Sequence, residues 1–347
     1  MATIKDIARE ANVSVTTVSN VIHRRSSRVA LETIERINAI IVRNHYTPNL
    51  SARSLVNKTS RIIGVINHLF RSQTVSFLQD PFHGALLGGV EKAIQKRGYY
   101  MMIRTVADEQ ELFSLFNNWN LDGVILTGLF NDAFFERLLE MDKPLVLLDS
   151  YVKNEKVFNI GLDDFQGGFI ATEYLVKKGH RNIAFASPFF HDEEGVVNER
   201  FKGYKTCLKE NGIAFSEENV YQRDITVEEG IEIGRKLSRR SDVTAVFATA
   251  DILAAGIISG LTRTGRRVPE DVSVVGFDDL FFSRVLTPPL TTIHQDIEER
   301  GRIAANTMMD YLEGKKTASR IVTPIKLIER SSVASLIAPL KKDKVEE

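Results

Sequence analysis

Short apolar runs alternate with longer amphipathic segments from residue 61 onward, and this alternation restricts the fold more than any other feature of the chain. Between the runs, apolar residues recur at helical spacing, as in the segment 83–96. Strands that alternate with helices form parallel sheets with helices on both faces. The sequence therefore predicts an α/β protein with strands at residues 62–66, 99–103, 123–126, 145–148, 183–186, 245–248 and 273–277.

Seven strands exceed what one small core holds, so we expect two doubly wound α/β subdomains that divide near residue 160. A cleft would lie between them, and ligands of such folds bind at the carboxyl ends of the strands. The segment 252–261, ILAAGIISGL, is apolar on nearly every side, which is typical of a helix buried on two faces. One face would meet a sheet, and the other would either lie deep in the core or meet a partner subunit.

The composition excludes several classes of protein. Of the 347 residues, 43% are hydrophobic and 26% are charged, as in an ordinary globular chain. No apolar run approaches the ~18 residues that a membrane span needs, and the N-terminus has no signal-peptide core. One cysteine, Cys207, and seven scattered histidines form no disulfide or zinc pattern. We therefore expect a cytoplasmic protein with no metal, no cofactor and no membrane partner.

The charges are distributed unevenly along the chain. Residues 1–60 carry nine Lys or Arg against four Asp or Glu, whereas the remaining residues carry 36 against 41. The formal net charge of zero thus hides a basic head on a mildly acidic body. This distribution indicates that only the head meets a polyanion.

The head is predicted to form three short helices and no strand. Thr3 and Asp6 match a capping box at the start of the first helix. A break follows at Asn12, and Ser14 is placed to cap the second helix, whereas Ala30 is a poor cap for the third. The second and third helices would span residues 15–22 and roughly 32–45.

The second helix presents a short polar face made of Val15, Thr16, Ser19 and Asn20. Two short helices with a four-residue break have the geometry of a helix-turn-helix, whose second helix enters the major groove of DNA. Asparagine can bond an adenine edge, and valine and threonine methyl groups can contact a thymine methyl. A plain three-helix bundle with a polar surface fits the same pattern, so the pattern alone leaves both interpretations open.

Longer strings add specificity to these patterns. In the head they are TIKDIAREANVSVTTVSNVI at 3–22, Tyr46-Thr47-Pro48 and Ala52-Arg53-Ser54-Leu55; in the body they include Gly179-His180-Arg181, Val275-Gly276-Phe277-Asp278-Asp279 and Pro289-Leu290-Thr291-Thr292-Ile293. With these strings the chain strongly resembles the LacI/GalR (lac repressor) family of bacterial transcription regulators. The resemblance implies a regulator, by default a repressor of carbohydrate-utilisation genes, that binds a pseudo-palindromic operator as a homodimer.

The resemblance also implies which head residues contact DNA. Base contacts would come from Val15, Thr16 and Asn20, and phosphate contacts from Ser14, Thr17 and Ser19. Tyr46 and Asn49 would touch the DNA backbone. In the hinge helix, Ala52 would allow a close approach, and Leu55 would enter the minor groove and bend the operator.

For the body, the resemblance implies a periplasmic-binding-protein-like core of two subdomains that are crossed by three strands. The domains would be a head at 1–46, a hinge or linker at 47–60, an effector-binding core at 61–340 and a polar tail at 341–347. The N-subdomain would comprise about 62–160 and 292–322, and the C-subdomain about 163–290 and 325–340. The effector would be bound by Phe82, Asp164, Arg200, Ile225, Asp251 and Asp278.

The chemistry of three of these residues favours a sugar as the effector. Arg200 offers a fork of donors, Asp278 accepts from vicinal hydroxyls, and Phe82 can stack on a sugar ring. Alternatively, Arg200 and Asp278 pair with each other across the closed cleft. Ala250 stands where relatives often carry an asparagine, which leaves a purine-like corepressor or a phosphorylated carrier protein as alternative effectors.

An α/β enzyme is a further alternative, for which the expected motifs are missing. No Gly-x-Gly-x-x-Gly follows the run at 62–66, and no Gly-x-Ser-x-Gly occurs in the chain. Gly260 and Gly265 have P-loop spacing but are followed by two arginines instead of Lys-Ser or Lys-Thr. We therefore expect no catalytic residues.

Overall fold

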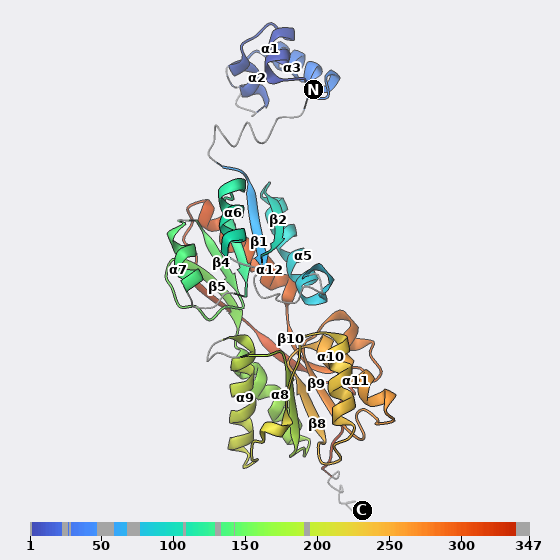
Figure 1. Cartoon of the computed structure of the whole chain (residues 1–347). Coiled ribbons are helices and arrows are strands. Elements are labelled where there is room, and N and C mark those ends of the chain that lie inside the picture. The colour runs from blue at the N-terminus through green and yellow to red at the C-terminus, as the bar shows by residue number, and fades with distance from the viewer. Residues whose placement is uncertain are drawn as a thin grey trace, which may run out of the picture. The chain divides into compact units, whose positions relative to one another are not determined.

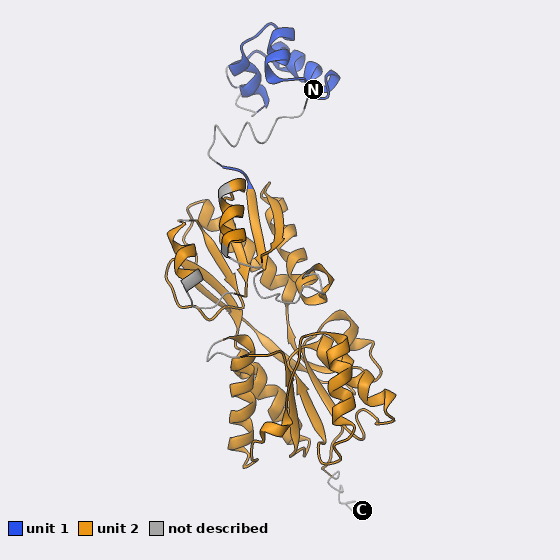
Figure 2. Ribbon diagram, viewed as in Figure 1, with its two compact units in different colours: residues 1–61 blue, residues 62–347 orange. Residues whose placement is uncertain are grey.

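The protein forms two compact units, residues 1–61 and residues 62–347, which Figure 2 shows in different colours. In this computed structural model the described residues are 2–22, 27, 29–46, 59–67, 77–106, 109–128, 133–141, 143–190 and 195–337. No helix within these ranges is long and apolar enough to cross a membrane.

The head contains the three predicted helices, α1 (Ile4–Glu10), α2 (Val15–Ile22) and α3 (Leu31–Arg43). The capping box at Thr3 and Asp6 is present, and Ala30 makes no side-chain cap, both as predicted. Asn12 ends α1 in the left-handed conformation, with φ of +51°, and two backbone bonds close the helix end behind it. The turn between α1 and α2 is therefore specified by local sequence.

The head has its own apolar core. Side chains from all three helices are buried together, including Ile7, Val18 and Ile37, which have no exposed surface. The predicted apolar faces at helical spacing account for this packing. The polar residues of α2 are left on the opposite side of the helix.

The second unit contains two six-stranded sheets (Figure 1). The first sheet is entirely parallel, in the order β11-β5-β4-β3-β1-β2. Its strands are β1 (Ile62–Asn67), β2 (Tyr100–Thr105), β3 (Gly123–Thr127), β4 (Leu145–Leu148), β5 (Val157–Leu162) and β11 (Arg320–Thr323). Helices α5 (Pro81–Lys96) and α12 (Ile297–Leu312) pack on one face, and α6 (Glu109–Trp119) and α7 (Ala133–Glu140) on the other.

The second sheet has the order β12-β10-β9-β8-β6-β7. Its strands are β6 (Ile183–Ser187), β7 (Val220–Gln222), β8 (Ala245–Ala248), β9 (Ser273–Asp278), β10 (Thr291–Gln295) and β12 (Ile325–Ile328). All pairs are parallel except β10 with β12, which are antiparallel. Helices α8 (Asp164–Lys177) and α9 (Val196–Glu210) cover one face, and α10 (Val227–Leu237) and α11 (Asp251–Arg263) the other. The predicted class, two doubly wound α/β subdomains, is correct.

The chain passes between the sheets three times. It leaves the first sheet after β5, returns after β10, and crosses again between β11 and β12. The resemblance implies that the C-subdomain ends near 290 and the N-subdomain resumes near 292, but β10 pairs with β9 as far as His294. The second sheet therefore extends to Gln295, a few residues beyond the expected boundary.

Glycine pairs allow neighbouring helices to approach closely. On α8 and α9, a Cβ at Gly168 or at Gly203 would lie 2.1 Å from a backbone oxygen of the facing helix. On α10 and α11, Gly230 faces Gly256 in the same way. The segment predicted to be buried on two faces is α11, and α10 of the same chain packs against it. Core burial, one of the two alternatives, therefore accounts for its apolar character.

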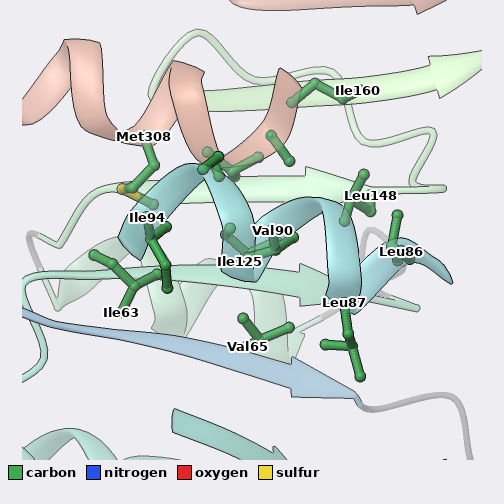
Figure 3. Close-up of a cluster of buried hydrophobic side chains, with 14 of the residues drawn as sticks. Ile63, Val65, Leu86, Leu87, Val90, Ile94, Ile125, Leu148, Ile160 and Met308 are labelled. Carbon is green, nitrogen blue, oxygen red and sulfur yellow. The ribbon is translucent and has the colours of Figure 1, made fainter. Parts of the chain in front are cut away.

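The largest apolar cluster of the first subdomain draws on distant parts of the sequence. Figure 3 shows Ile63 of β1, Val90 of α5 and Ile125 of β3 packed with Met308 of α12. Residues that lie more than 240 positions apart thus share one core. The helix α12 belongs structurally to the first subdomain although it follows most of the second in sequence.

Candidate functional sites: the helical head and the junction of the sheets

The outward face of α2 carries the head residues that were predicted to contact DNA. Val15 and Thr16 are exposed at the first turn, and Ser19 and Asn20 are half-buried further along. Ser14 caps the helix, because its Oγ accepts from the Thr17 backbone N–H at 3.1 Å. The helix start thus presents short side chains and the positive end of the peptide dipoles, a combination suited to phosphate.

Two further predicted residues of the head are described by the structure. The Thr17 hydroxyl is 2.9 Å from Ser14 Oγ, so it already has an internal partner. Tyr46 follows α3 and packs against the head core. Asn49, Ala52 and Leu55, together with most of the predicted hinge, lie outside the described residues.

Arg200 forms the centre of one polar group in the second subdomain. Its Nε donates to Asp164 Oδ1 at 2.8 Å, its Nη2 forms an ion pair with the same oxygen at 2.8 Å, and its Nη1 donates to the carbonyl of Thr249 at 2.7 Å. The guanidinium lies over the ring of Phe277, with 3.5 Å between Cζ and the ring centroid. Tyr151 donates to the other oxygen of Asp164 at 2.8 Å. Arg200 therefore pairs with Asp164, whereas the alternative interpretation had paired it with Asp278.

Asp278 lies at the carboxyl end of β9, and its surroundings raise its pKa. Burial is the main cause, and nearby Asp251 adds to it, while Arg200 acts in the opposite direction. Its backbone has φ of +114°, a region that costs an L-residue on the order of 1–3 kcal/mol. Strain of this kind collects at functional sites, so Asp278 remains the strongest candidate among the predicted carboxylates.

A second polar group links Asp278 to the first subdomain. Gln295 donates from Nε2 to Asp278 Oδ1 at 2.6 Å, and its Oε1 accepts from Arg300. Arg300 belongs to α12 and also binds Asp149, which follows β4. The chain of contacts Asp149–Arg300–Gln295–Asp278 therefore runs from one sheet to the other.

Asp251 has an internal role in the structure. It is fully buried and accepts from the Leu280 N–H at 2.8 Å and from the hydroxyls of Ser283 and Thr292 at 2.6 Å each. Burial raises its pKa to about 7. The carboxylate thus joins the start of α11 to β10 and to the short helix η3 (Phe281–Arg284).

Phe82 and Ile225 occupy different surroundings. Phe82 lies at the start of α5, packs against the core of the first subdomain and contacts the ring of His83 edge-on. The preceding Asp80 caps α5 and is close enough to Asp278 to raise its pKa. Phe82 thus lies near the junction of the sheets. Ile225 lies between β7 and α10 with 43% of its surface exposed.

A pocket of about 390 Å³ opens beside the same polar groups. Asp149, Tyr151 and Asp164 line it together with residues of β5 and β11. Of the predicted effector residues, only Asp164 is in its wall. Because two crossing segments and the loop after β4 form the pocket, an occupant would touch the parts of the chain that join the subdomains.

Four residues of these polar groups were not predicted from the sequence: Asp149, Tyr151, Gln295 and Arg300. For two of them, the position in the sequence gives a reason to predict a site. Asp149 directly follows a buried strand, and Arg300 occupies a position on the apolar face of α12, between Ile297 and Ala304. A charged residue at a core position of an amphipathic helix is unusual enough to mark a site.

Comparison with known proteins agrees with this architecture. A model described as "Bacterial regulatory proteins, lacI family" matches residues 3–49, and one described as "Periplasmic binding protein-like domain" matches residues 172–333. The HTH-type transcriptional repressor PurR of Erwinia tasmaniensis is 33% identical over 343 residues, covering 96% of this chain and 97% of that protein. The chain belongs to the LacI family of bacterial regulatory proteins.

Other family members are similar over the same length. The ribose operon repressor of Haemophilus influenzae is 32% identical over 97% of this chain and 100% of its own. A complex of the transcriptional regulator CelR with cellobiose has 30% identity and a TM-score of 0.71, covering 96% of this chain and 100% of that one. The lac repressor dimer bound to operator and the anti-inducer ONPF shares the fold, with a TM-score of 0.83 at 24% identity, covering 96% and 99%.

Proposed function

We propose that this protein is a transcriptional repressor that binds operator DNA as a homodimer and is controlled by a small molecule, a sugar, at the junction of its two sheets. The observation that carries the proposal is the exposed polar start of α2 on a head that matches the lacI family model. The relatives PurR and the ribose operon repressor are named as repressors. A regulator of this kind needs no catalytic residues.

DNA recognition is assigned to α2. Val15, Thr16 and Asn20 would contact base edges, and Ser14, Thr17 and Ser19 would bind phosphates. Thr17 would keep its bond to Ser14 or exchange it for a phosphate oxygen. Outside the helix, Tyr46 and Asn49 would contact the backbone, and Ala52 and Leu55 would act in the minor groove as hinge residues.

The effector is assigned to the junction of the sheets. Asp278, Arg200, Asp164 and Phe82 would surround it, and these residues provide acceptors, donors and an apolar ring face for a polyhydroxyl ligand. Asp251 would act indirectly, through its charge interaction with Asp278, and Ile225 would contact the effector at the edge of the site. The complex of CelR with cellobiose and the ribose operon repressor support a sugar as the ligand class.

Control of DNA binding would follow from the contacts that cross the junction. An effector that engages Asp278 competes with Gln295, whose other end is held by Arg300 of the first subdomain. Occupancy would thereby shift the preferred arrangement of the subdomains. Coupling of this type is typically 1–3 kcal/mol, and it acts equally in both directions between effector and DNA.

The test begins with selection of operator sequences from a random duplex library on the purified full-length protein. The variant Asn20→Ala should lose preference at one base pair of the selected site, with a cost of ~1–3 kcal/mol. Asn38→Ala makes the same chemical change at an exposed position of α3 and should leave the preference intact. A uniform loss of affinity across all sequences in Asn20→Ala would argue against base recognition by α2.

A purine-like corepressor is the second candidate effector, and the similarity to PurR favours it. A thermal-shift screen with sugars, nucleobases and sugar phosphates separates the candidates, because a ligand at 100 times its Kd adds ~2.7 kcal/mol of stability. Stabilisation by nucleobases alone would assign the protein to the corepressor class. If no small molecule stabilises it, a phosphorylated carrier protein becomes the candidate.

A further inference from the structure

The pocket of about 390 Å³ lies mainly on the face of the first sheet that is opposite α12. Successive side chains of a strand point to opposite faces, and Ile160 of β5 and Ile321 of β11 belong to the apolar cluster that contains α12. The alternate residues Gly161, Arg320 and Val322 therefore face the other side, and all three line the pocket. The sheet thus lies between most of the pocket and α12.

The loop between β4 and β5 forms one wall of the pocket, and side chains hold it in place. Asn159 donates from Nδ2 to the carbonyls of Ser150 and Val152, at 2.6 and 3.2 Å. Val152 is buried in the apolar cluster that contains α6 and α7, which fixes the loop over this face of the sheet. Beside the loop, β11 is the edge strand, and its residues Arg320 and Val322 are exposed. The pocket is therefore bounded by backbone that is fixed on both sides.

The floor of the pocket has room for an apolar group. Gly161 contributes no side chain, and a Cβ at this position would meet no atom of the described residues within 4 Å. On the neighbouring strand, Val322 has 50% of its surface exposed, and Leu162 also lines the pocket. Covering apolar surface is favourable by about 25 cal/mol per Å². A ligand with an apolar body would therefore be stabilised at this floor.

The charges around the pocket favour an anion. Lys153 and Arg320 line it and are exposed, and within the described part of the chain their side chains form no hydrogen bond and no ion pair. Asp149 and Asp164 also line it, but each is already bound by an arginine. The remaining carboxylate of the wall is the exposed Glu155. Two unpaired cations against one unpaired carboxylate leave a positive balance.

The same loop connects the pocket to the contacts between the two sheets. Tyr151 of the loop donates to Asp164 Oδ2 at 2.8 Å, and Asp164 in turn accepts from Arg200 of the second subdomain. At the start of the loop, Asp149 binds Arg300 of α12. A ligand that moves the loop would therefore act on both polar groups of the junction without lying between the sheets.

We propose that this pocket is a second ligand site, additional to the proposed effector site, and that it takes a small organic anion with an apolar body. Lys153 and Arg320 bind the phosphate or carboxylate of the ligand, and Gly161 and Val322 contact its apolar part. Occupancy changes the affinity for the operator through the bond of Tyr151 to the second subdomain. This last step rests on the proposed function, whereas the binding of the anion does not.

The experiment titrates the full-length protein with phenyl phosphate and with benzoate, followed by ligand-observed NMR at constant ionic strength. Benzyl alcohol is the neutral counterpart, and inorganic phosphate is the anion without an apolar body. One variant combines Lys153→Gln with Arg320→Gln, and a second, Gly161→Val, fills the floor without changing the charge. The control combines Lys156→Gln with Lys326→Gln, which removes the same charge at exposed positions outside the pocket wall.

Phenyl phosphate or benzoate should bind more tightly than benzyl alcohol, and the tighter of the two identifies the head group. Loss of Lys153 and Arg320 should weaken this binding roughly 4- to 25-fold, because each exposed ion pair contributes roughly two- to fivefold, and the control should bind as the wild type does. Gly161→Val should weaken phenyl phosphate by roughly tenfold or more through overlap with the ring, and should leave inorganic phosphate unchanged. Glu155→Gln should strengthen the binding of either anion.

The coupling is measured as affinity for the selected operator. A saturating anion should change this affinity by roughly fivefold or more in the wild type. The change should be absent without Lys153 and Arg320, and Tyr151→Phe should bind the anion but show a smaller change.

Three results overturn the assignment of the pocket: no binding of either organic anion, equal binding of benzyl alcohol, or an equal loss of affinity in the lysine control. Anion binding with unchanged operator affinity overturns the coupling alone. Failure to select any operator in the absence of an anion contradicts the proposed function, and the anion titrations still decide the assignment of the pocket.

Discussion

Replacing Gly168 with alanine should push α8 and α9 apart and disturb Arg200. The backbone of Gly168 faces the backbone of Arg200 directly, and an ideal Cβ at this position would lie 2.1 Å from the Arg200 carbonyl oxygen and 2.8 Å from its Cα. Both atoms belong to the backbone, so no side-chain rotation relieves the overlap. The two helices must move instead.

The size of the effect follows from these distances. Ordinary contact begins near 3.4 Å, so the helices must separate by about 1.3 Å at this point. Asp164 is in the first turn of α8, and its bond from Arg200 Nε is 2.8 Å long, so a shift of this size exceeds the range of a hydrogen bond. Overpacking of this kind costs about 1–3 kcal/mol. The melting temperature of the second unit should fall by roughly 2–10 °C.

The assay is thermal unfolding of the full-length protein followed by circular dichroism, together with titration of the effector identified by screening. Gly84→Ala is the control, because a Cβ at Gly84 on α5 meets nothing within 4 Å. Alanine is favoured over glycine within a helix by roughly 0.5–1 kcal/mol, so this control should be neutral or slightly stabilising. Effector affinity should fall only in Gly168→Ala, and operator-binding residues of the head should retain their structure.

A Gly168→Ala protein that is as stable as the Gly84→Ala protein would refute the reasoning. It would mean that α8 and α9 can separate without loss of packing. Reduced stability with unchanged effector affinity would refute a narrower point, namely that the spacing of these helices positions Arg200 for binding.

Two further predictions concern the head and the buried carboxylate. Thr3→Ala removes the two hydrogen bonds of the Thr3 hydroxyl, one accepted from the Asp6 N–H and one donated to the Asp6 carboxylate, and keeps the bond from the Thr3 N–H to Asp6. It should lower the stability of the head by about 0.5–2 kcal/mol, measured by its thermal unfolding, with no effect on the melting of the second unit. The pKa of Asp251 is about 7 in the folded protein and near 3.8 in the unfolded chain, so between these pH values the folded state binds more protons than the unfolded state. The free energy of unfolding should therefore fall by up to about 1.4 kcal/mol per pH unit as the pH rises through this window. Denaturant unfolding at pH 5, 6, 7 and 8 should show this slope in the wild type and a smaller one in Asp251→Asn, and equal slopes would contradict a raised pKa at this site.

Local features of the fold could be predicted from the sequence, because they depend on neighbouring residues. The first helix of the head ends just before Asn12, and the predicted apolar runs coincide with strands that are almost entirely buried, except for β2 at a sheet edge, which is partly exposed. β7 was not predicted, because three residues carry too little pattern to be distinguished from a loop. β11 and β12, which contain charged residues and lie at sheet edges, were expected only through the resemblance to a family.

The junction of the sheets was harder to predict, because its contacts join residues that are far apart in the sequence. Asp149 and Arg300 are separated by 151 positions. The alternative interpretation, which paired Arg200 with Asp278, was wrong for a related reason. Asp164, Asp251 and Asp278 are all acidic residues near strand ends, and only the three-dimensional arrangement shows which one the guanidinium reaches. Residue type limits which side chains can form a polar pair, but the fold determines which of them are close enough in space to do so.

The three crossings impose an order on the synthesis of this protein. The first sheet receives its edge strand β11 only when residue 323 has been translated, and its core is completed by Ala304, Ala305 and Met308 of α12. Strands β6 to β10 of the second sheet, which lie between β5 and α12 in the sequence, are translated before the first subdomain can close. The nascent first subdomain therefore leaves the ribosome with an open apolar face, and a chain truncated before α12 would expose that face to chaperones and proteases.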